Sequence, residues 1–257
     1  MAQPSTHEFD LKEYVLQHVA NSNEWHVPFL GTIPLPGITL HGFMLILWAS
    51  AMIVVFCALY NKKARVPQGL TNFLEMFVVF IRDEIVVPSL GKEDGRKMTP
   101  LFCTFFFFIL GLNLLGLIPL FATATSNISV TGALASVTLV VMIGGAVCKQ
   151  GLGGFLKSFV PHGIPLPVLF IIVPLEFLGM FIKAFALMIR LFANMLAGHI
   201  VIFSILGLVA LFGAIGSLSV LLAVPISLLE VFIAFLQAYI FTLLSAMFIG
   251  QMLHPQH

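Results

Sequence analysis

Charged residues are scarce in this sequence: Lys, Arg, Asp and Glu make up 9% of its 257 residues, whereas 60% are apolar. A soluble globular domain carries about 25% charged residues, so that class is excluded. The net charge of +1 leaves no basic surface for nucleic acid. Apolar runs long enough to cross a bilayer predict an all-α, polytopic membrane protein instead.

Cysteine is also rare, and the motifs of common catalytic sites are missing. The three cysteines, Cys57, Cys103 and Cys148, lie far apart in apolar segments, which predicts neither a disulfide framework nor a zinc site. The sequence contains no phosphate-binding glycine loop, no G-x-S-x-G elbow and no H-E-x-x-H pair. We therefore expect no metal, no cofactor and no nucleotide site, and no enzymatic catalysis by this chain.

The N-terminal segment, residues 1–37, differs from a targeting peptide. It carries five charged residues, four of them acidic, and has no apolar core, unlike a signal peptide or an Arg-rich transit peptide. We expect the chain to enter the membrane through its own later spans. The sequence leaves the structure of this segment open.

The middle region, residues 38–163, predicts three conventional spans at residues 38–60, 101–121 and 130–148. The first has 23 residues, about 35 Å of helix, which matches a hydrocarbon core of about 30 Å. A short Thr/Ser/Asn connection, residues 122–129, joins the other two.

Charge asymmetry gives the expected orientation. Seven of the twelve basic residues fall in residues 61–97, so this loop is expected on the cytoplasmic side and the N-terminus outside. Within the loop, residues 70–88 carry apolar residues every three to four positions, among them Leu70, Phe77 and Ile85. This pattern predicts an amphipathic helix that rests on the membrane surface or on a partner.

The last region, residues 164–257, predicts a hairpin of two long helices. Residues 176–197 contain no cluster of turn-forming residues, which gather only at Gly207, Gly213 and Gly216–Ser219. Helices of roughly 40 and 35 residues would each be about 50 to 60 Å long, nearly twice the bilayer core. Both must therefore tilt steeply.

Two polar lines run along this hairpin. Glu176, Lys183 and Arg190 are spaced by seven residues and fall near one helix face, which Asn194 continues. Glu230 and Gln237 have the same spacing on the second helix. A charge inside a bilayer costs at least about 2.5 to 3.5 kcal/mol, so these groups need pairing, water or a function.

Each polar residue also has a structural interpretation. Arg190 is either a functional cation, a snorkelling residue, or half of an ion pair with Glu176 or Glu230; Lys183 is either a member of the line or the partner of Glu176. His199 and Glu230 suit a proton-transfer pair, although a lone histidine more often only packs. Asn113 either lines a hydrated cavity or bonds a neighbouring helix.

The polar segments resemble subunit a of the F-type ATP synthase, a proton-translocating membrane stator subunit. The resemblance rests on RLFANMLAGH (190–199), on PLEFLGMFIKAFALMIR before it and on LEVFIAFLQAYIF from Leu229, with NLLGLIP (113–119) in the second span. It covers the last 90 or so residues best, and the first 37 match only loosely.

The resemblance implies roles for these residues. Arg190 would be the essential arginine that faces the rotor ring of c subunits, with Asn194 and Gln237 beside it. Glu176 would belong to the cytoplasmic half-channel, and His199 and Glu230 to the outer one, where some members hold the two residue types in exchanged order. We count Asn113 and Lys183 as further candidates for the proton pathway.

Several alternatives stay open at this point. An ion-coupled secondary transporter is the main one, although such proteins usually show two repeated halves and the charges here occupy only one. A membrane anchor of a redox complex lacks support from paired histidines. The expected partners are the c-subunit ring, the b-subunit peripheral stalk, the lipid bilayer and protons, with Na+ as the alternative ion. A bacterial plasma (inner) membrane is the expected location, with an organelle as the alternative.

Overall fold

The computed structural model describes seven stretches of the chain: residues 24–27, 31–34, 37–59, 69–118, 121–160, 166–212 and 217–254. Residues 1–23, most of the expected N-terminal segment, lie outside the described residues. So do residues 213–216, at the expected turn of the C-terminal hairpin.

The described part of the N-terminal segment contains a small β-hairpin. Its strands, β1 (Glu24–Val27) and β2 (Gly31–Pro34), pair antiparallel with Trp25 opposite Ile33. The ring of Trp25 packs against Phe43 and Phe121, with centroids 5.5 and 6.2 Å away. The hairpin is therefore attached to the helical body, a contact that the polar N-terminal sequence did not predict.

Helices make up the rest of the described chain. In order they are α2 (Leu40–Leu59), α3 (Leu70–Phe80), the π-helical turn η1 (Ile81–Val86), α4 (Val87–Leu90), α5 (Lys92–Gly116), the 3-10 turn η2 (Ala124–Ser126), α6 (Ile128–Lys157), α7 (Leu166–Phe212) and α8 (Ser217–Leu253). Five of them, α2, α5, α6, α7 and α8, are long and apolar enough to cross a membrane. The all-α, polytopic architecture is thus confirmed, and so is the pair of long C-terminal helices, with 47 and 37 residues.

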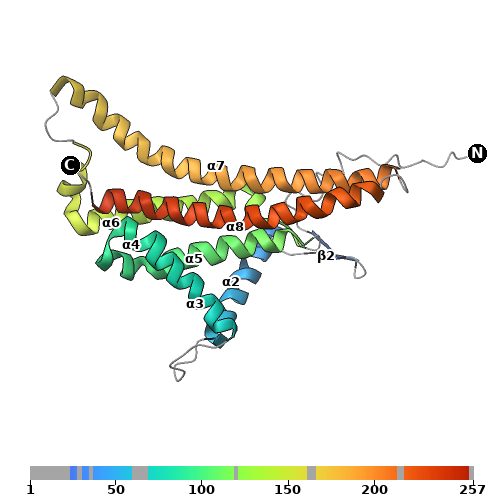
Figure 1. Cartoon of the computed structure of the whole chain (residues 1–257). Helices are drawn as coiled ribbons and strands as arrows, with labels where there is room; N and C mark the ends of the chain where they lie inside the picture. Colours follow the sequence, from blue (N-terminus) through green and yellow to red (C-terminus); the bar gives the residue numbers. More distant parts are fainter. Residues whose placement is uncertain are drawn as a thin grey trace, which may run out of the picture.

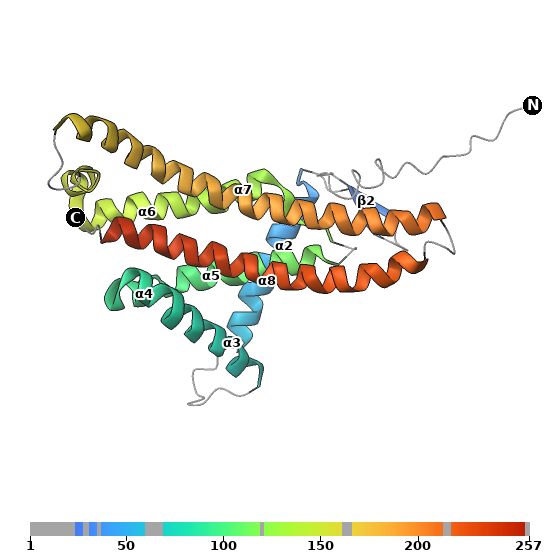
Figure 2. The ribbon, with the colours of Figure 1, turned by 45° about the horizontal axis from the view of Figure 1, so that its top comes forward.

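The four later spanning helices run together, whereas α2 does not. In Figures 1 and 2, α5, α6, α7 and α8 lie side by side and α2 crosses them steeply. The crossing is fixed at α5, where Trp48 Nε1 donates a hydrogen bond to the carbonyl oxygen of Phe107 at 3.2 Å. If α2 stands upright in the bilayer, the steep tilt expected of the hairpin extends to α5 and α6.

The bounds of α5 and α6 differ from those expected of the second and third spans. Helix α5 begins at Lys92, nine residues earlier, after Gly91 with φ 83°. Glu93 and Asp94 occupy its first turn, where negative charge complements the helix dipole. Helix α6 extends to Lys157 but breaks at Gly151, whose φ is 74°. The expected spans were bounded by where the apolar run starts and stops, so the polar ends of these two helices were left out.

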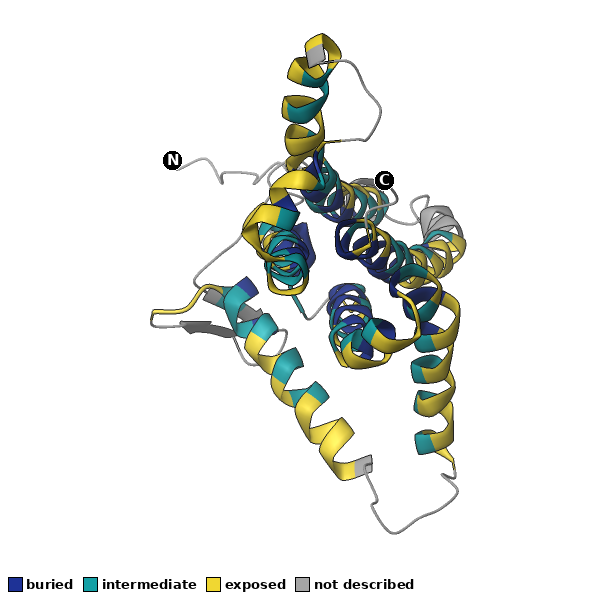
Figure 3. Cartoon of the chain, turned by 90° about the vertical axis from the view of Figure 1, so that its left-hand side faces the viewer, coloured by how far each residue is buried: buried dark blue, intermediate teal, exposed yellow. Residues whose placement is uncertain are grey.

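The amphipathic segment is helical throughout, as α3, η1 and α4. Its apolar side turns inward only in the second half, where Ile81, Ile85 and Val86 are fully buried against α5 and α8. In the first half, Leu70 and Phe73 stay more than half exposed. Figure 3 shows α3 and α2 diverging from the bundle with exposed outer faces.

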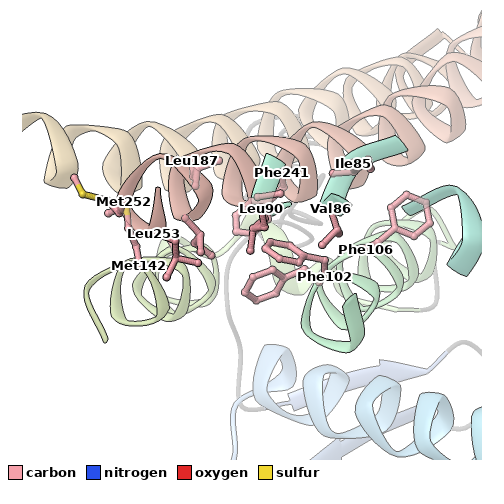
Figure 4. Close-up of a cluster of buried hydrophobic side chains, with 14 of the residues drawn as sticks. Ile85, Val86, Leu90, Phe102, Phe106, Met142, Leu187, Phe241, Met252 and Leu253 are labelled. Carbon is pink, nitrogen blue, oxygen red and sulfur yellow. The ribbon is translucent and has the colours of Figure 1, made fainter. Parts of the chain in front are cut away.

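The main core lies where α4, α5, α6, α7 and α8 converge (Figure 4). Its largest fully buried side chains include Phe102, Phe106 and Phe241. Phe105 and Phe241 meet edge to face at 5.6 Å, a favourable geometry for aromatic rings. This core fixes α8 against the other helices, and α7 then covers one side of α8 (Figure 1).

Candidate functional site

The expected polar residues of α7 and α8 gather around two neighbouring hollows between these helices. Arg190 is nine residues before His199, about two and a half helical turns, so the two lie on opposite faces of α7. Arg190 is accordingly exposed, and His199 is 4% exposed. One helix thus presents a cation to the outside and an imidazole to the inside.

The first hollow, here called the Arg190 recess, opens to the surface of the described chain. Arg190, Asn194 and Gln237 line it together with the small residues Ala193 and Ala197. Asn194 Nδ2 donates to Gln237 Oε1 at 3.4 Å, a long hydrogen bond, and Nε2 of Gln237 is buried without a partner. The structure therefore brings together the three residues that the resemblance placed side by side.

Arg190 has no carboxylate beside it. The ion pairs among the described residues join Arg82 to Asp83, and Asp94 to Lys149 and His254. Neither Glu176 nor Glu230 pairs with Arg190, so the structural interpretation as half of an ion pair finds no support there. A guanidinium keeps its charge at any working pH, and this one lines an open recess.

The second hollow, here called the Glu230 cavity, has a volume of about 240 Å3 and is lined by His199, Glu230, Gly198 and Asn194 among others. Glu230 is 6% exposed, yet neither carboxylate oxygen has a hydrogen-bond partner within the described part of the chain. A buried polar group of this kind needs a partner, and a water molecule takes up about 30 Å3 of liquid volume. The cavity has room for several waters between Glu230 and His199.

Glycine at position 198 makes the placement of Glu230 possible. A Cβ atom there would lie 2.9 Å from Glu230 Oε1 and 3.2 Å from its Cδ. The carboxylate of α8 therefore rests directly against the backbone of α7. No hydrogen bond joins Glu230 to His199, whose Nε2 instead lies 2.6 Å from the hydroxyl of Thr123.

Asn113 of α5 is completely buried and bonds two neighbouring elements. Its Oδ1 accepts from Thr125 Oγ1 at 2.8 Å, and its Nδ2 reaches the carbonyl oxygen of Ala234 on α8 at 3.5 Å. The helix-bonding interpretation therefore describes its contacts. Thr123 and Thr125 belong to the connection that we expected to be an ordinary loop, and their polarity alone did not reveal that they are buried.

Lys183 and Glu176 lie apart from both hollows. Lys183 Nζ donates to Gln251 Oε1 at 3.0 Å and lies 5.5 Å from the ring centre of Phe248. Its partner is thus the end of α8, and Glu176 is exposed near the start of α7. The predicted face of α7 exists, but its residues reach different neighbours. No group of three or more His, Cys, Asp or Glu that could hold a metal occurs among the described residues.

The two hollows adjoin. Asn194, Ala197 and Ile233 line both of them, so a short step separates the buried acid and imidazole from the exposed arginine. Proton-exchanging groups inside and a permanent cation outside form an arrangement that can deliver protons to a site beside Arg190.

Comparison with known proteins shows the family of this chain. The family model of the ATP synthase A chain matches residues 42–250. ATP synthase subunit a of Myxococcus xanthus is 42% identical over 93% of this chain and 87% of its own length. The subunit a of Chloroherpeton thalassium is 43% identical over 94% of this chain and 77% of its own length.

A third relative is longer. This chain is 48% identical to subunit a of Anaeromyxobacter dehalogenans over 82% of its own length, and spans 57% of that relative. The match over most of this chain leaves no support for the alternative of a secondary transporter or a redox anchor. The chain belongs to the family of ATP synthase A chains, the proton-translocating stator subunits of the F-type ATP synthase.

Proposed function

We propose that Arg190 is the charge barrier between two proton half-channels, and that it faces a ring of c subunits. The observation that carries this proposal is the shared wall of the Glu230 cavity and the Arg190 recess. A proton that has reached Glu230 from one side can pass into the Arg190 recess, because three residues line both hollows. There the fixed cation repels it, unless a carboxylate from a partner accepts it.

The arginine acts on that carboxylate by electrostatics. A guanidinium offers five donors and stabilises the ionised form of an acid next to it in a medium of low dielectric. A rotor carboxyl that arrives protonated therefore releases its proton at Arg190. Once neutralised again from the other half-channel, it can move into lipid, so the ring turns as protons cross.

The second half-channel runs in the opposite direction along α7. Glu176 is 14 residues before Arg190, about 21 Å, and His199 is about 13 Å beyond it at 1.5 Å per residue. Together these distances are about 34 Å along the helix, and because α7 is tilted they cover a smaller depth of the hydrocarbon core, which is about 30 Å thick. We place Glu176 at the cytoplasmic opening and Lys183 beside it, with the N-terminus outside.

The driving force is about 2.3 kcal/mol per charge for each 100 mV of membrane potential. This chain conducts the protons that this force drives and catalyses no reaction itself. ATP is formed elsewhere in the complex. The c-subunit ring and the b-subunit peripheral stalk are the proposed partners, in a bacterial plasma membrane.

Cysteine cross-linking tests the contact with the rotor. In the assembled complex, with Cys57, Cys103 and Cys148 replaced by Ser, Ala193→Cys and Ala197→Cys should cross-link to a cysteine in the ion-binding helix of the c subunit. Both alanines are exposed beside Arg190, whereas Leu191 is fully buried, so Leu191→Cys is the matched control. Equal cross-linking at position 191, or none at 193 and 197, would refute the proposal.

A further inference from the structure

A short buried turn connects two histidines that come from helices far apart in the sequence. The turn is η2 with its two flanking residues, Thr123 and Asn127. At one end, Thr123 Oγ1 lies 2.6 Å from Nε2 of His199 on α7. At the other end, the side-chain nitrogen of Asn127 lies 3.2 Å from Nδ1 of His41 on α2.

The turn is more deeply buried than a connection between spans usually is. Thr125 is 0% exposed, and Thr123, Ser126 and His41 are between 3% and 7% exposed. Connections normally run over the surface, and burying hydroxyls is unfavourable unless they are bonded. Here they are bonded: Ser126 Oγ donates to the carbonyl oxygen of Thr123 at 2.8 Å, and Thr125 Oγ1 to Asn113.

The spacing suits proton transfer. Two residue steps lie inside the 3-10 turn and one extended step flanks it at each end, so Thr123 and Asn127 are at most about 11 Å apart along the backbone. Three hydroxyls lie on this path, and each can accept and donate a hydrogen bond at the same time. Thr125 Oγ1 and Ser126 Oγ donate here to Asn113 Oδ1 and to the carbonyl oxygen of Thr123, so both hydroxyls must rotate to pass a proton along the path. One or two waters between them would complete a connected series from His41 to His199.

We propose that His41 and the hydroxyls of Thr123, Thr125 and Ser126 form the entry segment of the proton path that ends at His199 and Glu230. The inference rests on the proposed function, because it extends the outer half-channel from α7 and α8 to α2. His41 takes one proton from the outer water and passes one on. Each hydroxyl accepts a proton on its oxygen and releases the hydrogen it carried, so one proton arrives at Nε2 of His199 and the turn is unchanged.

A glycine keeps the inner end of this segment in place. A Cβ atom at Gly116 would lie 2.4 Å from Thr123 Oγ1 and within 3 Å of two of its carbons. The end of α5 therefore admits Thr123 only because residue 116 has no side chain. Gly116→Ala would move the hydroxyl away from His199 without removing any polar group.

Access of water to position 41 is the first test. In the assembled complex with the three native cysteines replaced by Ser, His41→Cys should react with silver ions added to the outer side, and ATP-driven proton pumping should fall. Met44 lies one turn along the same helix and is 1% exposed within an apolar cluster, so Met44→Cys should not react. Equal inhibition at both positions, or at neither, would overturn the proposal.

Proton flux is the second test. His41→Leu should slow passive proton flow through the membrane sector roughly tenfold, less than the 100-fold typical of a lost acid–base group, because water and hydroxyls remain. Thr123→Val and Gly116→Ala should slow it as well. The double variant His41→Leu/Thr123→Val should be little slower than the worse single variant, because both act on one series of steps. Multiplying effects would indicate two unrelated structural defects and would refute the proposal.

The failure of this inference can be told apart from that of the proposed function. If Arg190→Ala abolishes coupled pumping while His41→Leu and His41→Asn pump at the normal rate, only the entry segment is wrong. If Arg190→Ala pumps normally, the proposed function fails first. Co-purification of each variant with the c subunits shows that it has assembled.

Discussion

The two ends of the helical bundle hold similar polar residues in opposite situations. At the C-terminal end of α8, Asp94 accepts hydrogen bonds from Lys149 Nζ and from His254 Nε2, the latter at 3.1 Å. In the Glu230 cavity, an acid and a histidine also share one site, but neither oxygen of Glu230 has a partner. In the first group, here called the Asp94 cluster, the acid has two partners; in the second, the acid has none among the described residues.

Under the proposed function, the Asp94 cluster holds helices together, whereas the Glu230 cavity carries protons. The Asp94 cluster joins the ends of α5, α6 and α8, and Gln150 strengthens it by donating to the carbonyl oxygens of Met252 and Leu253. Partly exposed ion pairs of this kind contribute little energy and need no exchange of protons. A buried acid next to an empty volume exchanges partners with water instead. Four substitutions, in order of decreasing expected effect, test this contrast.

Arg190→Ala should have the largest effect. Proton-driven ATP synthesis should be abolished and passive proton leak should rise, because the cavities remain while the cation is gone. Arg190→Lys should fail too, since an ammonium lacks the planar fork and can lose its proton. Synthesis and leak are measured in membrane vesicles, with Leu236→Ala in the same recess as control. Coupled pumping by Arg190→Ala would contradict the assignment.

Glu230→Gln should slow proton translocation roughly 10- to 100-fold without stopping it, because water in the cavity keeps part of the path open. His199→Ala should act in the same direction. The pH dependence of the rate, measured across about pH 6 to 9, should change in both variants because a titrating group is lost. Ile226→Val alters only an apolar wall of the same cavity and should change neither. An unaltered profile in Glu230→Gln would make Glu230 a packing residue.

Gly198→Ala should slow translocation severalfold. The new methyl group would displace the carboxylate of Glu230, which sits at the flexible end of its side chain and can move aside. Gly179→Ala adds the same methyl group to the same helix, where nothing lies within 4 Å, and should leave the rate unchanged. Equal rates in the two variants would show that the exact position of the carboxylate is unimportant.

Asp94→Asn should have the smallest effect. The loss of a partly exposed ion pair should lower stability by less than about 1 kcal/mol, seen as a small decrease in the thermal unfolding temperature of the purified complex. Proton pumping should stay normal. A large loss of pumping would place the Asp94 cluster on the proton path and remove the contrast between the two ends.

The sequence predicted the long helices of the fold well, and the resemblance placed Asn194 and Gln237 beside Arg190. Seven-residue spacing placed Arg190 and Asn194 on one face, and the scarcity of turn residues before Gly207 predicted one unbroken helix. Both signals are local, so they can be recognised without the tertiary structure. The hydrogen bond between Asn194 and Gln237 was not predicted from this spacing and became visible only in the packed pair of helices.

The contacts that sequence reasoning missed depend on long-range packing. Thr123 and Thr125 have the composition of a surface loop, and only the approach of α7 and the absence of a side chain at Gly116 bury them. Likewise, Lys183 donates a hydrogen bond to Gln251, 68 residues later, and not to Glu176 on its own helix. A polar residue in an apolar helix is expected to have a hydrogen-bond partner, but its position in the sequence does not identify that partner.

The opposite faces of α7 also limit how this helix can change. Because Arg190 and His199 are connected by an unbroken helical rod, inserting or deleting one residue between them would turn one relative to the other by about 100°. Substitutions in the intervening stretch that spare Asn194 and Gly198 keep the two faces in place, as long as the number of residues is unchanged. The number of residues between Arg190 and His199 is therefore a stronger constraint on this segment than the identity of most of them.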